Sequence, residues 1–296
     1  MPKLTGTLRD GSPFEQSVNA RTKRLRLYQH DLATLDLAAL AAAPNLEICE
    51  TGQNAIEIPS LAPLASCRAL TNLSIAVPAG TDLSPLAACP ALRALHLYIG
   101  GDAPCDLGWL AQLRTLESLS ISQQGAPPPI DLSPLRELRV RSVSLSGITN
   151  ARLDLDWVSP AFDGLYIGAA EQLAELDLAP LAGTRLRTFN LHTCRALEHL
   201  DLAPLAKLPL ERIAFYEVWI KDLFLYPLAE CPELHSLQLL HHATRTLDVT
   251  PLAPLAKLDD LDIDGKDAPV LAQHALGKLA SPGVREWHRA GQLTIE

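Results

Sequence analysis

The sequence predicts an α/β solenoid of about ten stacked coils, with a curved parallel β-sheet on the concave side and short helical turns on the convex side. Near-copies of one segment, DLSPLAACPALRALHLYI at 82–99, recur along the chain with a period of about 24 residues. Each copy ends in leucines that alternate with polar residues, which is typical of a half-buried strand. Because one coil cannot bury its own leucines, neighbouring coils must stack.

The segment 82–99 predicts how one coil is built. Asp82 and Ser84 stand where a helical turn begins, since their side-chain oxygens can accept hydrogen bonds from free backbone N–H groups. Pro85 suits the first turn, where a missing N–H costs nothing. The leucines of the segment point into the core, and His96 and Tyr98 face the other side of the strand.

The copies differ in quality along the chain. Close copies of the opening begin at residues 36, 131, 177, 201 and 248. Looser copies are assigned to Glu57, Asp106, Asp154 and Asp222. Insertions rich in Gly and Pro at 99–106 and 122–130 predict loops after strands, which are either plain variation or part of a binding rim. Around Trp157, Asp154 is interpreted as a turn-capping residue and the indole as core, rather than as part of an acid–base site.

The repeated words resemble the leucine-rich repeat family, and within it the bacterial internalin-like subclass. They are Asp-Leu-Ser-Pro-Leu-Ala at 82–87 and its copies, each followed by L-x-x-L-x-L as at 92–97, 116–121 and 258–263. The family's asparagine after the strand is missing; the corresponding positions include Gly100, Ala170, Cys194 and Val218. The resemblance implies a binding scaffold, but this family binds many unrelated partners.

Composition narrows the class of function. Hydrophobic residues make up 48% of the chain and aromatic residues 5%, so leucine and alanine dominate the core. The net charge of −9 argues against nucleic-acid and anionic-membrane partners. No apolar run approaches the roughly 20 residues of a membrane span. The opening segment MPKLTGTLRDGSPFEQ has no secretory pattern, so we expect a cytoplasmic protein.

The cysteines and histidines give no sign of metal or covalent chemistry. Four cysteines each lie three residues before a leucine of the repeated L-x-x-L-x-L frame, which indicates small buried core residues. They are Cys67, Cys89, Cys194 and Cys231. The sequence contains no C-x-x-C pair, H-E-x-x-H, P-loop or dinucleotide fingerprint. We therefore expect no metal, no cofactor and no catalytic residues.

Three regions are expected. Residues 1–21 read as an N-terminal capping hairpin with Asp10-Gly11 at its turn, or alternatively as a small functional arm. The solenoid spans 22–267, starting with a strand in TKRLRLYQH. Residues 268–296 predict a C-terminal cap that contains a helix.

The strand positions that alternate with the buried leucines predict the binding surface. They include Glu47 and Cys49 in an early coil, and serines in the middle coils. Tyrosine and histidine recur there, and tyrosine is enriched among residues that carry binding energy. The predicted partner-binding residues are His96, Tyr98, Tyr166, Asn190, His192, Tyr216, Gln238, His242 and Asp262.

The leading hypothesis is a non-enzymatic scaffold that binds a protein or peptide on this face. One alternative is a small-molecule sensor or enzyme with a His/Tyr/Asp site on the same face. Another is a structural protein whose repeats assemble edge to edge. The sequence leaves the partner's identity and the oligomeric state open.

Overall fold

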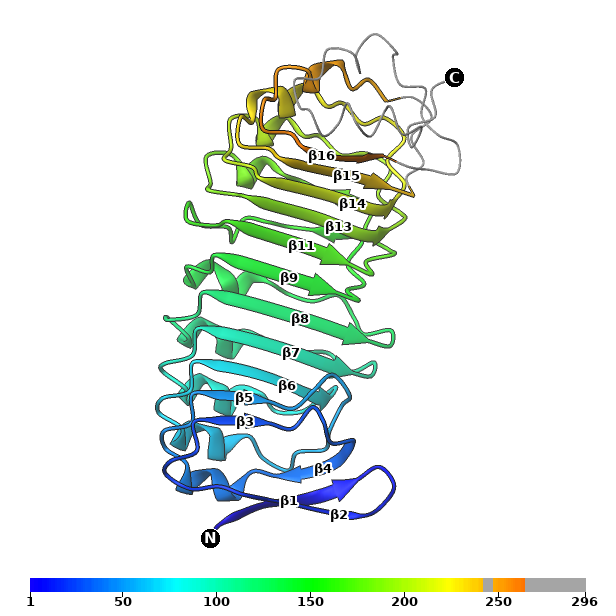
Figure 1. Ribbon diagram of the computed structural model, residues 1–296. Coiled ribbons are helices and arrows are strands. Elements are labelled where there is room, and N and C mark those ends of the chain that lie inside the picture. The colour runs from blue at the N-terminus through cyan, green and yellow to red at the C-terminus, as the bar shows by residue number, and fades with distance from the viewer. Residues whose placement is uncertain (242–246, 264–296) are drawn as a thin grey trace. The chain divides into compact units, whose positions relative to one another are not determined.

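The computed structural model describes residues 1–241 and 247–263 (Figure 1). It divides into two units, Met1–Val140 and Arg141–Glu296, called unit 1 and unit 2 below. Each unit is a stack of coils whose strands form one parallel layer, with short 3-10 turns on the opposite side (Figure 1). The leucine-rich repeat solenoid predicted from the sequence is confirmed.

The parallel strands of unit 1 follow one another in chain order. They are β3 (Arg24–Arg26), β5 (Ile48–Glu50), β6 (Asn72–Pro78), β7 (Ala94–Gly100) and β8 (Ser118–Gln124). The 3-10 turns of this unit are η1 (Ala38–Ala42), η2 (Ala62–Ser66), η3 (Ser84–Ala88), η4 (Gly108–Gln112) and η5 (Ser133–Glu137).

Unit 2 repeats the arrangement. Its parallel layer consists of β9 (Ser142–Ser146), β11 (Gly164–Gly168), β13 (Thr188–Cys194), β14 (Arg212–Val218), β15 (Ser236–Leu240) and β16 (Asp260–Ile263). A second parallel pair joins β10 (Arg152–Leu153) to β12 (Glu175–Leu176). The 3-10 turns are η6 (Ala179–Leu181), η7 (Ala203–Leu205), η8 (Tyr226–Glu230) and η9 (Thr250–Leu252).

An antiparallel sheet opens unit 1. β1 (Lys3–Leu8) and β2 (Pro13–Ser17) form a hairpin, and Gly11 takes the φ of 84° that its turn needs. β4 (Leu32–Asp36) pairs antiparallel with β1 on its other side, which the sequence analysis did not predict. Leu4, Val18 and Leu35 are fully buried, so the hairpin adds its own leucine and valine to the core.

Most of the 3-10 turns follow an aspartate whose side chain accepts a hydrogen bond from the backbone N–H two residues later. In the coil at 82–99, Oδ1 of Asp82 accepts a hydrogen bond from the Ser84 N–H at 2.9 Å. Leu86 is fully buried just after Pro85. The same bond joins Asp154 to the Asp156 N–H, and Trp157 is 4% exposed, which confirms the structural interpretation of that segment. The burial of Cys67, Cys89, Cys194 and Cys231 is also as predicted.

Two of the looser copies were placed wrongly. The turn η2 follows Leu61, so the copy assigned to Glu57 begins at Ser60. The turn η8 follows Leu225, so the copy assigned to Asp222 begins at Phe224. In both coils the proline at the turn marks the register, while the residue in the aspartate position is not an aspartate.

The register of the second coil also differs from the prediction. Cys49 pairs with Leu25 and Leu73 and is 1% exposed, so Ile48 and Glu50 take the open positions predicted for Glu47 and Cys49. The frame here reads Leu-x-x-Cys-x-Thr, and Thr51 fills the place of a leucine. Because Cys49 and Thr51 replace leucines, the L-x-x-L-x-L pattern could not be recognised in this coil. The loops predicted from 99 and 122 begin later as well, because β7 continues to Gly100 and β8 to Gln124.

Candidate functional site

The solvent-facing side of the parallel strands, called the strand face below, carries most of the predicted binding residues. Unit 1 contributes His96 and Tyr98 from β7. Unit 2 contributes residues from five strands, and they are Tyr166, Asn190, His192, Tyr216, Gln238 and Asp262. His242 lies outside the described residues. Each unit is therefore considered separately.

The strand register of unit 2 brings two predicted residues into contact. His192 on β13 pairs directly with Tyr216 on β14. Their rings stack with centroids 4.8 Å apart and planes inclined by 4°. This stacking is favourable, and each ring restricts the rotamers of the other.

A third ring comes from His241, which the sequence analysis did not place among the binding residues. β15 ends at Leu240, and His241 adopts a left-handed φ of 51°. This turn ends the strand alternation and brings the His241 ring edge-on to Tyr216, at 5.1 Å and 89°. We call His192, Tyr216 and His241 the ring cluster.

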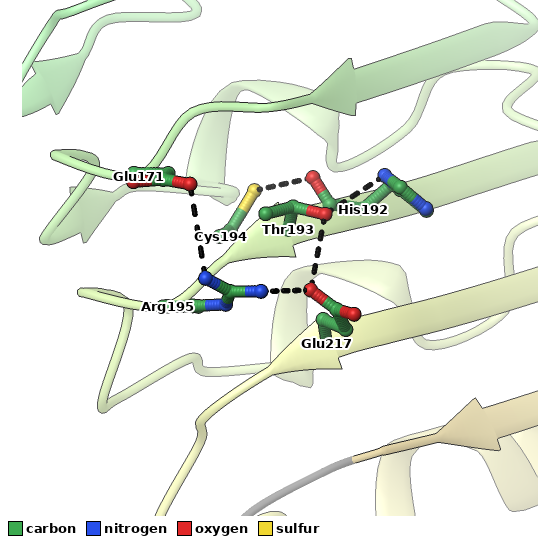
Figure 2. A network of polar contacts seen from close by, with 6 residues as sticks. All are labelled: Glu171, His192, Thr193, Cys194, Arg195 and Glu217. Carbon is green, nitrogen blue, oxygen red and sulfur yellow. Dashed lines mark hydrogen bonds and ion pairs between the residues drawn. The ribbon is translucent and has the colours of Figure 1, made fainter.

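A polar network reaches the ring cluster through His192 (Figure 2). The Thr193 hydroxyl lies 3.0 Å from Nδ1 of His192 and 3.5 Å from Oε2 of Glu217. Arg195 donates to Glu217 and forms a longer ion pair with Glu171, 3.8 Å away. The hydrogen bond from Arg195 holds the pKa of Glu217 below its usual value, so this carboxylate is charged at neutral pH.

Trp219 extends this surface and was missed by the sequence analysis. It is 48% exposed, and the Arg195 guanidinium carbon lies 5.8 Å from the centre of its ring. An exposed indole beside a guanidinium is a cation–π pair. The sequence signal was present, because Trp219 directly follows the buried Val218 at the end of β14, yet it lies beyond the alternating positions.

Small residues and one unsatisfied amide lie beside the ring cluster. The Tyr166 ring lies over Gly168, since a Cβ at that glycine would stand 2.5 Å from the tyrosine oxygen. Asn190 pairs with Tyr166 and with Ala214, and its buried Oδ1 has no hydrogen-bond partner among the described residues. Buried polar atoms are nearly always satisfied in proteins, so this oxygen is an exception among the described residues.

The last two predicted residues of unit 2 are less closely associated with the rings. Gln238 donates from Nε2 to Asp260 at 3.0 Å, and the Ser236 hydroxyl donates to the same carboxylate oxygen at 2.7 Å. Asp262 pairs with Gln238 in the strand register and is half-buried. Asp260, which the predicted set omits, thus orders the strand face of β15.

In unit 1 only one of the two predicted residues lines a groove. Tyr98 lines a groove of about 670 Å³ on the strand face, with Tyr28 also in its lining. His96 points from the adjacent open position of β7 and does not line it. Burial lowers the pKa of His96, although Glu50 acts in the opposite direction.

The described residues contain no group of three or more His, Cys, Asp or Glu side chains placed to hold a metal ion. Burial raises the pKa of the Cys194 thiol to about 11, which leaves it protonated and unreactive beside the network. Within the described part of the chain, no helix has the length and apolar character needed to cross a membrane.

Comparisons with known proteins identify the fold. No family model matches the chain, and no curated protein matches it either. An internalin from Listeria monocytogenes superposes with a TM-score of 0.63 at 24% identity, over 88% of this chain and 72% of that one. A leucine-rich repeat protein from Leptospira interrogans superposes with a TM-score of 0.55 at 16% identity, over 88% and 74%. The chain has the internalin-like leucine-rich repeat fold.

Proposed function

We propose that the protein is a non-enzymatic scaffold that binds a protein or peptide on the strand face of unit 2. The observation that carries this proposal is the ring cluster, in which His192 and the turn residue His241 both contact the Tyr216 ring. Tyrosine is enriched among residues that dominate binding energy, and rings that are already ordered lose little entropy when a partner covers them.

The surroundings of the ring cluster suit a protein partner. Arg195, Glu217 and Glu171 supply a charged border on one side. Asn190 on β13 and Gln238 on β15 supply amide groups, and Ala214 on the intervening strand β14 leaves space for a main chain to approach. A rigid aromatic centre with a polar border is the usual composition of a protein interface.

Photo-crosslinking tests the location of this surface. We would replace Ala214, which lies on the strand face between Asn190 and Gln238, by p-benzoylphenylalanine. The matched control places the same crosslinker at Ala203, an exposed alanine in the turn η7. We expect a protein adduct in host lysate from position 214 and not from position 203.

A second substitution makes the result specific. Tyr216→Ala in the Ala214 crosslinking variant should abolish the adduct, because the central ring is gone. Tyr226→Ala, which removes an exposed tyrosine on η8, should leave the adduct unchanged. An adduct that survives Tyr216→Ala, or forms equally well from position 203, would refute the proposed surface.

A further inference from the structure

The groove on the strand face of unit 1 is a second, separate candidate site. Its volume of about 670 Å³ lies within the roughly 300–1,000 Å³ typical of small-ligand sites. Two tyrosines, Tyr28 and Tyr98, belong to its lining. All the residues that line the groove belong to unit 1, so the groove shares no residue with the ring cluster of unit 2.

A break in the strand pattern creates the wall of the groove. β5 stops at Glu50, whereas the neighbouring β6 continues to Pro78. The buried Thr51 hydroxyl accepts a hydrogen bond from the Ala76 N–H at 3.0 Å, which replaces a strand contact. Gly52 then turns the chain outward with a φ of 102°, a conformation that favours glycine. Gln53 and Asn54 consequently line the groove.

The N-terminal hairpin holds this wall from behind. Arg9, directly after β1, donates from Nη2 to the Ala55 carbonyl at 2.8 Å. Its Nε is ion-paired with Asp31 at 3.1 Å. The loop at 51–55 is therefore tied to the hairpin on one side and to β6 on the other. A wall fixed before the ligand arrives lowers the entropy cost of binding.

The polar groups of the lining suit an uncharged ligand with many hydroxyls. Arg26 and Glu50 form an ion pair of 3.0 Å, so their charges cancel while their remaining donors and acceptors face the groove region. Gln53 and Asn54 have no hydrogen-bond partner among the described residues, and each amide both donates and accepts. Ser74 adds a hydroxyl with the same double capacity.

We propose that this groove binds a neutral saccharide of about two sugar rings. A sugar presents hydroxyls that both donate and accept, which matches the amides, the hydroxyl and the ion pair. Its C–H face packs against an aromatic ring, which Tyr98 or Tyr28 supplies. The described lining contains no aliphatic side chain, so it lacks the apolar pockets that an extended peptide fills with alternate side chains.

Saturation-transfer difference NMR on the full chain tests this proposal. The probes are maltose, cellobiose, lactose and N,N′-diacetylchitobiose, with trialanine as the peptide comparison. We expect saturation transfer from the protein to at least one disaccharide and no transfer to trialanine. Tyr98→Ala should lower the affinity for that disaccharide by about tenfold or more, because the stacking surface is lost. Tyr98→Phe keeps the ring and should stay within about threefold.

Further variants separate a lost site from a lost fold. Asn54→Ala changes an exposed loop residue and should also lower the affinity for the disaccharide. Its circular dichroism spectrum should match that of wild type, which shows that the fold is kept. Tyr216→Ala in unit 2 should leave the disaccharide signal unchanged, so this test is independent of the proposed protein-binding function. Saturation of no disaccharide, saturation of trialanine alone, or a signal insensitive to both Tyr98→Ala and Asn54→Ala would overturn the proposal.

Discussion

The two units end their strands in different ways. In unit 1 every positive φ among the described residues belongs to a glycine, as at Gly52, Gly101 and Gly125. In unit 2 the turn position recurs every 24 residues from Ala169, and its occupants are Ala169, Thr193, Glu217 and His241, with φ between 47° and 53°.

This difference determines which elements carry the candidate binding side chains. A glycine turn carries no side chain, so unit 1 obtains its groove from the loop that follows Gly52. A left-handed turn at a residue with a side chain costs roughly 1–2 kcal/mol, but it places Thr193, Glu217 and His241 beside the rings of unit 2. Backbone strain of this kind is common at functional sites.

The largest expected effect concerns the cores of the two units. Phe189 and Phe215 pack edge to face at 5.4 Å in unit 2, where the corresponding strands of unit 1 use leucines such as Leu95. Phe189→Ala should lower the free energy of unfolding by about 3–5 kcal/mol, because it leaves a cavity beneath the ring cluster. Urea denaturation followed by circular dichroism measures this. A loss below about 1 kcal/mol would mean that the site collapses freely.

A smaller loss is expected at a glycine turn of unit 1. Gly125 has a φ of 103°, and a Cβ there would lie 2.5 Å from Oδ1 of Asp102. Gly125→Ala should therefore cost about 1–3 kcal/mol, since the left-handed backbone and the close contact both oppose it. The control Gly11→Ala keeps a positive φ of 84° but meets no atom within 4 Å, so it should cost less. Equal losses would show that the contact is unimportant.

The opposite substitution should stabilise unit 2. Ala169 is exposed and has a φ of 47°, a conformation that glycine adopts without steric cost. Ala169→Gly should raise the free energy of unfolding by up to about 1 kcal/mol. Ala203→Gly, at an exposed alanine in η7 with no positive φ, should lower it. If both variants lose stability, the turn at Ala169 is not strained.

The smallest effect is the pH dependence of the network around the rings. Because Arg195 lowers the pKa of Glu217 in the folded protein, the stabilisation is present above the unfolded value near 4.5 and is lost as the pH falls through the folded pKa. Thermal unfolding of wild type and Glu217→Gln should differ at neutral pH and converge in acid. A difference that persists below the folded pKa would point to a contact of the side chain that does not depend on charge.

Much of the fold could be predicted from the sequence, because the repeat makes each coil reinforce the others. Leu95, Leu97 and their counterparts fix the strand frame, and an aspartate–proline turn marks coils such as the one at 82–99. The predictions failed where a coil departs from its own pattern. Cys49 and Thr51 hid the frame of β5, and Phe224 replaces an aspartate. Such substitutions keep the fold because neighbouring coils impose the register.

The candidate site was less predictable. Alternation placed Tyr98, His192 and Tyr216 on the strand face, since it requires only the period of two. It failed at His241, because a left-handed turn ends the alternation, and it omitted Trp219, which lies after the strand. It also gave no sign of the groove at Gly52, whose wall depends on the hydrogen bond from the hairpin to Ala55.

The role of the ring cluster is tested most directly by isothermal titration calorimetry with the partner captured at position 214. The partner is titrated into wild type, Tyr216→Ala and Tyr226→Ala. We expect Tyr216→Ala to weaken binding by about thirtyfold, which corresponds to roughly 2 kcal/mol, and Tyr226→Ala to match wild type. Equal affinity for wild type and Tyr216→Ala would contradict the claim that the ring cluster binds the partner.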